Sequence, residues 1–203
     1  MIRRVRGIEQ IPWLYDPVCA IAEWTGLARW RRWLVEGARG HALDLGCGTG
    51  RNLPLYRPGV RVVGLDPVGA TLRRARRRAP AVALVQGSAE ALPFRAAAFD
   101  TVVSGLVWCS VPDPARALVE VRRVLRSGGT LRMLEHVRST RSWKARWQDR
   151  VQPAWTWVMG GCHPNRDTER AVEAAGFRIE PDSRRARGDM RRFAAQPIER
   201  SIP

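Results

Sequence analysis

The fold is decided by the stretch LDLGCGTG, residues 43–50. An apolar run that begins at His41 predicts a short buried strand, and Gly46, Gly48 and Gly50 follow it directly. Glycines let the main chain turn sharply and let a ligand approach it, because no Cβ stands in the way. The spacing G-x-G-x-G differs from the G-x-G-x-x-G of dinucleotide-binding turns, so a pyrophosphate is not the expected ligand. A plain tight turn is the alternative interpretation.

Two acidic residues accompany the glycine-rich turn. Asp44 stands two residues before Gly46, and Asp66 ends the next predicted strand, residues 60–66. A carboxylate at position 44 repels a pyrophosphate but favours a cationic amino group. Asp66 lies about 20 residues downstream, where an acidic side chain takes ribose hydroxyls in nucleotide-binding folds. A nucleoside with a positively charged tail fits both acids, and S-adenosylmethionine is such a molecule.

Strand and helix patterns alternate along the rest of the chain. Further strands are predicted at 81–86, 99–107, 130–137, 177–181 and 190–196. Helices are predicted at 12–35, 69–79, 113–127 and 166–175. The alternation predicts an α/β fold with a Rossmann-like, doubly wound, seven-stranded and mostly parallel sheet. Its final strand is expected to be antiparallel, because only a short connection precedes it.

The length of the chain predicts a single domain that spans residues 1–203. We expect four parts within it. They are an N-terminal cap of amphipathic helices (1–39), a cofactor-binding half (40–137), a lid insertion (138–164), and a C-terminal helix with strands (165–203).

The expected lid is a tryptophan-rich segment. Trp143, Trp147, Val151 and Trp155 recur at every fourth residue, which predicts one stripe along a helix. Pro153 interrupts or kinks that helix. The stripe either covers the sheet or forms a helical lid over an apolar acceptor pocket.

The composition is strongly basic. The net charge is +16, and Lys144 is the sole lysine, so arginine supplies almost all of the positive charge. This excess reflects genome composition or thermal adaptation, or else an anionic partner. Most tryptophans cluster at 13–33 and 143–157 beside arginines, which suits a lipid interface better than nucleic acid. No apolar run reaches the ~18 residues of a spanning helix, so we expect a cytoplasmic protein with, at most, peripheral contact to an anionic membrane.

The cysteines do not indicate a metal or a disulfide framework. Four cysteines lie far apart, and none forms a C-x-x-C pair. Cys162 and His163 are adjacent but supply too few ligands, so no metal is expected. Asn165 is predicted as the N-cap of the helix that follows, with Asp167 as a favourable charge in its first turn.

Several motifs together resemble the class I S-adenosylmethionine-dependent methyltransferases. They are LDLGCGTG, VVGLDP, GSAEALPF, FDTVVS and VRRVLRSGGTL. The resemblance implies S-adenosylmethionine as the cofactor and S-adenosylhomocysteine as its product. It also implies these cofactor-binding residues: Asp44, Gly46, Cys47, Gly48, Gly50, Asp66, Pro67, Ser88, Ala89 and Glu90. Ser88 departs from the family pattern, which has an aspartate there, and a serine hydroxyl gives a weaker contact than a carboxylate.

Motifs on the substrate side point to one group within this family. The motifs CSVPDP, LEHVRS, GCHPNRDT and AAGF are similar to the methyltransferase-like seven group of thiol methyltransferases and its bacterial relatives. This implies methyl transfer to a small apolar acceptor, with a thiol as the leading option. The bacterial phosphatidylethanolamine N-methyltransferases have a similar layout, and a quinone-type acceptor also stays open. The Asn/Asp-Pro-Pro-aromatic tetrad of base methyltransferases is absent, which argues against nucleic acid. A catalytically inactive cofactor-binding protein is the alternative that is not an enzyme.

Five residues are candidates on the acceptor side. His136 and His163 are candidate catalytic bases, and Trp108, Cys109 and Arg166 are candidate substrate-binding residues. A thiol reacts as its thiolate, so its proton needs an acceptor. His136 ends the fifth predicted strand, where ligands bind in such sheets, although a structural imidazole is the alternative. Core packing is likewise the alternative for the pair at 108 and 109.

Overall fold

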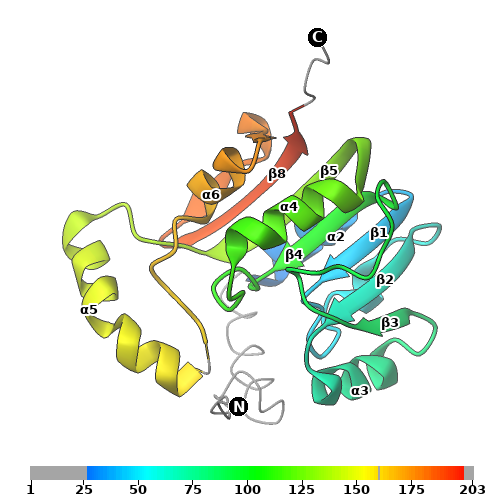
Figure 1. Cartoon of the computed structure of the whole chain (residues 1–203), viewed down its shortest axis with the longest axis horizontal. Helices are drawn as coiled ribbons and strands as arrows, with labels where there is room; N and C mark the ends of the chain where they lie inside the picture. The colour runs from blue at the N-terminus through cyan, green and yellow to red at the C-terminus, as the bar shows by residue number, and fades with distance from the viewer. Residues whose placement is uncertain (1–26, 160, 199–203) are drawn as a thin grey trace.

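An eight-stranded sheet forms the centre of the protein in the computed structural model, which describes residues 27–159 and 161–198 (Figure 1). The strand order is β3-β2-β1-β4-β5-β8-β6, and β7 pairs with β8 beside this path. The strands are β1 (His41–Leu45), β2 (Arg61–Asp66), β3 (Ala83–Gln86), β4 (Phe99–Gly105), β5 (Leu125–His136), β6 (Phe177–Ile179), β7 (Arg185–Arg187) and β8 (Met190–Pro197). β1 to β5 are mutually parallel, and β8 is antiparallel to β5, β6 and β7.

This topology confirms the predicted parallel sheet with an antiparallel final strand. The count of seven strands was one too low, because β7 folds back on β8 as a short hairpin that pairs Arg187 with Met190. Gly188 makes that turn with a φ of 58°, a left-handed conformation that favours glycine. The three exposed residues of β7 show no apolar alternation, so the sequence pattern does not reveal the strand.

Helices cover both faces of the sheet. They are α2 (Ala28–Glu36), α3 (Gly69–Arg78), α4 (Pro114–Val124), α5 (Ser142–Met159) and α6 (Thr168–Ala174), with the 3-10 turns η3 (Leu53–Leu55) and η4 (Pro181–Ser183). α4 and α6 lie in front of the sheet in Figure 1, and α2 lies behind it. Of the predicted N-terminal helices only α2 falls within the described residues; the segment 12–26 lies outside them.

Neighbouring residues of the central strands serve opposite faces of the sheet. Val102 of β4 packs in the core beneath α4, and Val103 packs with Leu34 in the core beneath α2. Successive side chains of a strand point to opposite faces, so a strand covered on both sides needs an unbroken apolar run. Val102 and Val103 meet this need, and both are fully buried.

The predicted boundary between α4 and β5 was wrong. The helix ends at Val124, and the extended chain begins at Leu125, opposite Phe99. The register then shifts, so that Thr130 pairs with Thr101. The residues between form an irregular segment in which Gly128 has a φ of 68°. The RSGG turn therefore belongs to a bulged strand instead of closing the helix.

α5 projects away from the sheet instead of covering it (Figure 1). It is continuous from Ser142 to Met159, with Pro153 inside the helix. Trp143, Trp147 and Trp155 are 61%, 57% and 44% exposed, so the interpretation that this stripe covers the sheet is wrong. The inner side of α5 is held by Gln148, which accepts a hydrogen bond from the Ser139 amide at 2.8 Å.

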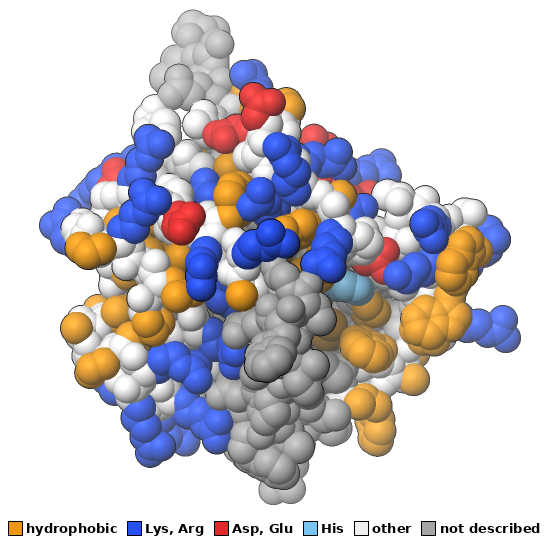
Figure 2. Space-filling view, turned by 180° about the vertical axis from the view of Figure 1, so that it is seen from behind, with side chains coloured by type: hydrophobic (Ala, Val, Ile, Leu, Met, Phe, Trp, Pro, Cys, Tyr) orange, Lys and Arg blue, Asp and Glu red, His pale blue; other side chains and the backbone are white. Residues whose placement is uncertain are grey.

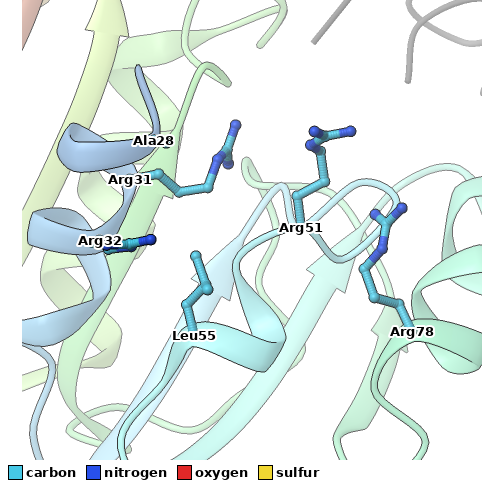
Figure 3. Close-up of a pocket in the computed structure, with 6 residues that line it drawn as sticks. All are labelled: Ala28, Arg31, Arg32, Arg51, Leu55 and Arg78. Carbon is cyan, nitrogen blue, oxygen red and sulfur yellow. The ribbon is translucent and has the colours of Figure 1, made fainter. Parts of the chain in front are cut away.

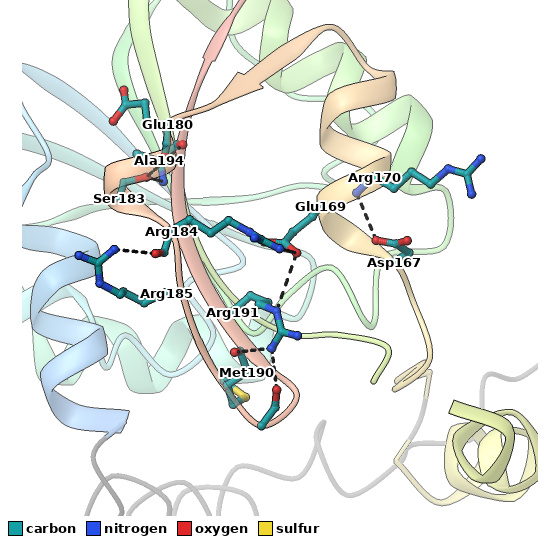
Figure 4. Close-up of polar contacts among 11 residues, drawn as sticks. Asp167, Glu169, Arg170, Glu180, Ser183, Arg184, Arg185, Met190, Arg191 and Ala194 are labelled. Atoms are coloured by element: carbon teal, nitrogen blue, oxygen red, sulfur yellow. Dashed lines mark hydrogen bonds and ion pairs between the residues drawn. The ribbon is translucent and has the colours of Figure 1, made fainter. Parts of the chain in front are cut away.

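α6 is tied to the β7–β8 hairpin by ion pairs (Figure 4). Glu169 accepts hydrogen bonds from Arg184 at 2.6 and 2.9 Å, and the buried Arg191 lies 3.8 Å from the same carboxylate. Arg191 also donates to the Gly188 carbonyl at 2.6 Å, which closes the hairpin turn. These ion pairs connect α6 to the residue before β7 and to β8.

The start of α6 differs from the predicted one. Asp167 is the N-cap and accepts a hydrogen bond from the Arg170 amide at 3.2 Å. Asn165 donates instead to Asp149 of α5 at 2.9 Å. The predicted cap at Asn165 was therefore wrong, because its amide connects two segments and the helix begins at Thr168.

Candidate functional site

The glycine-rich turn lies at the carboxyl end of β1. Gly46, Gly48 and Gly50 have φ values of 66°, 53° and 79°, all in the left-handed region. A Cβ on Gly46 would stand 2.4 Å from Val107, and a Cβ on Gly50 would stand 2.9 Å from the main chain of Ala75 in α3. A Cβ on Gly48 would meet nothing within 4 Å. Two glycines therefore permit tight packing, and the third leaves open space beside the main chain.

Asp66 connects this turn to β2. Its carboxylate accepts hydrogen bonds from the Gly48 amide at 2.9 Å, the Val68 amide at 2.9 Å and the Thr71 hydroxyl at 2.7 Å. Burial raises the pKa of Asp66, and these hydrogen bonds partly offset that effect. A carboxylate accepts about four hydrogen bonds, so Asp66 retains capacity for another donor. Its geometry fits the ribose contact that the sequence predicts.

Asp44 is a fully buried carboxylate with one unused oxygen. Its Oδ1 accepts a hydrogen bond from Asn52 at 3.1 Å, and Asn52 accepts one from the buried Arg31 at 2.7 Å. Its Oδ2 and the buried Tyr56 hydroxyl each make no hydrogen bond of ordinary geometry among the described residues, but the hydroxyl lies close enough to lower the pKa of Asp44. Burial raises the pKa of Asp44 to about 7, although Asn52 and Arg31 oppose this effect. A buried acceptor without a donor is costly, so this oxygen fits a cationic or hydrogen-bonding group of a ligand.

Sequence reasoning missed Arg31 and Asn52. Asn52 follows the glycine-rich turn by two residues, and this proximity is the one signal that could have indicated it. Arg31 is one arginine among many, and its bond to Asn52 joins positions 21 residues apart. Nothing in the local pattern distinguishes it from its neighbours.

A basic pocket of about 310 Å³ lies beside the glycine-rich turn (Figure 3). Arg31 and Arg32 approach it from α2, and Arg51 and Arg78 approach it from the other side. Arg78 donates hydrogen bonds to the main chain and the hydroxyl of Thr49 at 2.8 and 3.0 Å. The pocket is also lined by Ala28 and Leu55. Its positive potential favours an anionic group close to the turn.

The loop with the predicted cofactor-binding residues 88–90 lies next to the end of β2. The Gly87 amide donates to the Asp66 carbonyl at 3.2 Å, which places residues 88–90 beside that strand end. The Ser88 hydroxyl donates to the carboxylate of Glu90, so it is engaged within the loop. Ala89 is buried, and a carboxylate oxygen of Glu90 accepts a weak hydrogen bond from Asp113 at 3.3 Å.

Two other predicted cofactor-binding residues, Cys47 and Pro67, could contact a ligand mainly through their main chain. The side chain of Cys47 is buried, and its sulfur would lie 3.0 Å from a Cβ on Gly64, so it packs against β2. Burial raises the pKa of its thiol well above the ordinary value. Pro67 is exposed, and its carbonyl accepts a hydrogen bond from Gln86 at 3.1 Å.

Glu135 organises the loop after β4, residues 107–111, here called the floor loop. Its buried carboxyl accepts hydrogen bonds from the amides of Val107 and Trp108 at 3.1 and 3.2 Å and from the Ser104 hydroxyl at 3.3 Å. Burial raises the pKa of Glu135 to about 8. The sequence did not indicate this role, because the contacts join positions 27 to 31 apart.

His136 points to the opposite face of β5 from Glu135. Alternation places it on the side of Leu134, which packs beneath α2, the same face to which Asp44 belongs. Burial lowers the pKa of His136, and Asp189 and Lys144 are its charged neighbours. His136 therefore lies at the carboxyl end of the sheet, and its role as a base stays a prediction.

The remaining acceptor-side candidates come together around the floor loop. The His163 amide donates to the Cys109 carbonyl at 2.7 Å, and Arg166 donates to the carbonyls of Trp108 and Val111. His163 Nδ1 lies 2.7 Å from the Gly161 carbonyl, 3.2 Å from the Cys109 carbonyl and 3.4 Å from the Arg166 guanidinium; the two shorter contacts to carbonyls favour a proton on Nδ1, with Nε2 as an acceptor. Arg166 thus braces the main chain. A second pocket, of about 250 Å³, lies here and includes Trp108 and Arg166.

The Arg166 brace leads to a test. Replacing Arg166 by lysine removes the two-carbonyl contact, since an ammonium cannot reproduce the guanidinium fork. We expect a loss of about 1–2 kcal/mol in the free energy of unfolding, the range of hydrogen bonds to charged groups. Urea unfolding measures it, with the exposed Arg170→Lys as matched control. Equal stability of the two variants would show that the brace contributes nothing.

No group of three or more metal-ligating side chains comes together within residues 27–159 and 161–198. The candidate site thus has two parts: the residues Asp44, Gly48 and Asp66 at the glycine-rich turn, here called the turn site, and the floor loop next to them. Gly46 packs directly against Val107 of the floor loop, so the two halves are in contact.

Comparisons with known proteins agree with this geometry. Residues 43–133 match the methyltransferase domain family. Human thiol S-methyltransferase TMT1B is 38% identical over 153 residues, which are 70% of this chain and 63% of that protein. Phosphatidylethanolamine N-methyltransferase of Cereibacter sphaeroides is 38% identical over 108 residues, 50% of this chain and 53% of that one. The chain thus spans less than two thirds of the length of these curated relatives.

The fold has close counterparts among solved structures. An S-adenosylmethionine-dependent methyltransferase from Thermotoga maritima superposes with a TM-score of 0.73 at 20% identity, covering 93% of this chain and 97% of that one. At this identity the likeness establishes the fold alone. The chain therefore has the fold of S-adenosylmethionine-dependent methyltransferases, and its residues 43–133 match the methyltransferase domain family.

Proposed function

We propose that the protein transfers the methyl group of S-adenosylmethionine to a small apolar thiol. The observation that carries the cofactor half is the pair of buried carboxylates, Asp44 and Asp66, beside a glycine-rich turn whose main chain is open at Gly48. This combination suits a ligand with a cationic amino group and ribose hydroxyls. The thiol is supported by the 38% identity to human thiol S-methyltransferase TMT1B.

The bound cofactor supplies an electrophilic methyl group. Asp44 would bind its ammonium and Asp66 its ribose hydroxyls, while the basic pocket favours its carboxylate. The floor loop, fixed by Glu135 and Arg166, would position the acceptor and exclude water. His163 Nε2 is the acceptor that we assign to the thiol proton, because its other nitrogen donates to the main chain.

A second candidate is methylation of a phospholipid headgroup. It is favoured by the 38% identity to the Cereibacter phosphatidylethanolamine N-methyltransferase and by the exposed tryptophans of α5. In both cases we propose that the protein meets its acceptor at an anionic membrane surface. A quinone-type acceptor and an inactive cofactor-binding protein are the remaining alternatives.

A methyl-transfer panel tests the proposal. Purified protein is incubated with methyl-labelled S-adenosylmethionine and, in turn, an alkanethiol, phosphatidylethanolamine vesicles and a hydroquinone. We expect label in the thioether product. Label in methylated lipid or quinone would replace the thiol by that acceptor. Cofactor binding without transfer to any of the three would support the inactive cofactor-binding protein.

The pKa of Asp44 predicts a proton release on cofactor binding. The pKa is raised to about 7, so the free carboxyl is largely protonated below that pH. A bound cation favours the ionised form, so binding expels the proton, and cofactor affinity should rise about tenfold per unit from about pH 5.5 to 7. Calorimetry in two buffers of different ionisation enthalpy measures both effects. In Asp44→Asn the slope should flatten; an unchanged slope would assign the proton to another group.

A further inference from the structure

α5 presents an apolar face to solvent. Trp143, Trp147, Trp157 and Val158 are 61%, 57%, 69% and 43% exposed, and we call these four residues the Trp face. At about 100° per residue, they fall on one side of the helix, within about a third of its circumference. Figure 1 shows that α5 projects from the sheet, and Figure 2 shows apolar side chains gathered at that projecting edge.

Such a face is not explained by the fold. Single exposed apolar residues are normal, whereas several large ones side by side mark an interaction surface. The opposite side of α5 already makes the helix's contacts with the protein, through the buried Ala145 and Gln148. The Trp face is therefore not needed to hold α5 in place.

The charges on α5 select the partner. Arg146 and Arg150 of this helix are exposed, whereas Lys144 is half-buried and forms an ion pair with Asp189 at 2.6 Å. The sole acidic residue of this helix, Asp149, is turned away and accepts hydrogen bonds from Arg138 and Asn165. The face is thus apolar with a basic border, on a chain of net charge +16. Its charge complements an anionic surface.

We infer that the Trp face docks on an anionic lipid bilayer. Tryptophan, with its amphipathic ring, concentrates at the headgroup level, and flanking cations add attraction to acidic lipids. Within the described parts of the chain no helix is long and apolar enough to cross a membrane, so docking by this face is at the surface. The inference rests on the proposed function. It adds to that function the surface of the protein that would meet the lipid.

The position of α5 links this surface to the acceptor side. Thr156, near the end of the helix, donates a hydrogen bond to the Cys162 carbonyl at 2.9 Å. The next residue, His163, donates its amide to Cys109 of the floor loop. A bilayer held against the Trp face would therefore lie one short segment away from the floor loop. An apolar acceptor dissolved in the bilayer would reach the site without crossing much water.

Vesicle co-sedimentation of the full chain, without cofactor, tests the docking surface. The probe is vesicles of equal parts phosphatidylglycerol and phosphatidylcholine, at low and high salt, with pure phosphatidylcholine as comparison. We expect binding to the anionic vesicles that weakens with salt. The triple variant W143S/W147S/W157S should bind at least tenfold more weakly, and R146E/R150E should lose the preference for anionic lipid.

Two control variants change exposed apolar or charged side chains on other helices. V119S removes an apolar side chain on α4 that is 62% exposed, and R76E/R77E reverses two exposed charges on α3. Both should bind vesicles like the wild type. No binding by the wild type, or equal binding by the triple variant, would overturn the inference. So would a wild-type dimer in light scattering that the triple variant loses, since the face would then join two copies.

The result of the vesicle experiment can be distinguished from the result of the methyl-transfer experiment. Methyl transfer to a water-soluble thiol should persist in the triple variant, because none of its changes lies at Asp44, Gly48, Asp66 or the floor loop. Loss of vesicle binding with intact transfer supports the docking surface. Intact vesicle binding by a wild type that transfers no methyl group would reject the proposed function and leave the surface standing.

Discussion

Replacing Asp66 by alanine is expected to weaken S-adenosylmethionine binding about 100-fold or more, because each hydrogen bond to a charged group contributes about 1.5–3 kcal/mol. The carboxylate has two tasks at this position. It holds the Gly48 amide at 2.9 Å and the Thr71 hydroxyl at 2.7 Å, and it retains capacity for ribose hydroxyls. The variant therefore loses the ligand contact and the fixed end of the glycine-rich turn together.

Calorimetry with S-adenosylmethionine and S-adenosylhomocysteine measures this effect. Asp66→Asn keeps the side-chain volume and one acceptor oxygen, so it should bind with an affinity between those of the wild type and the alanine variant. Asp182→Ala, at an exposed aspartate in η4, is the matched control and should bind normally. Unchanged affinity in Asp66→Ala, with normal circular dichroism, would remove Asp66 from the cofactor site.

Replacing Glu135 by alanine is expected to lower the free energy of unfolding by about 3–5 kcal/mol. The change leaves the amides of Val107 and Trp108 and the Ser104 hydroxyl without their acceptor, and each buried unsatisfied group costs about 1–3 kcal/mol. The pKa of Glu135 is raised to about 8, so at neutral pH the variant loses mainly a neutral acceptor. Against a total of about 5–15 kcal/mol, the loss is severe.

Urea unfolding at neutral pH measures the change. Glu135→Gln preserves volume and one carbonyl oxygen and should lose less than half as much. Glu173→Ala, on the exposed side of α6, is the matched control. Its free energy of unfolding should lie within about 0.5 kcal/mol of the wild-type value. An alanine variant at position 135 that is as stable as this control would show that the floor loop does not depend on the carboxyl.

The parts of the fold that sequence predicts are those with a local signal. The glycine-rich turn, the strand that ends at Asp66 and the basic helix α3 are each written in adjacent residues. β7 escaped prediction because its three residues, two arginines around an alanine, are all exposed and too few to form a clear strand pattern. The end of α4 was misplaced because Val124 and Leu125 continue the helical pattern, while pairing with Phe99 draws the chain into the sheet.

The candidate site divides in the same way. Asp44 and Asp66 were predictable from their spacing to the glycines. The residues that support Asp44 were not predictable, since Arg31 of α2 reaches Asp44 only through Asn52, which lies 21 positions further along the chain. The Trp stripe shows the limit of periodicity: it predicted the helix of α5 but not which way its face points. Orientation depends on the contacts of Gln148, which bind segments distant in sequence.

The central claim is that Asp44, Gly48 and Asp66 hold S-adenosylmethionine for methyl transfer to a thiol at the floor loop. Its most direct test is labelled methyl transfer to an alkanethiol, with product identified by mass spectrometry, in the wild type and Asp66→Ala side by side. The account predicts an S-methyl product from the wild type and almost none from the variant. Equal product from both, or no methylated thiol from a wild type that binds the cofactor, would contradict it.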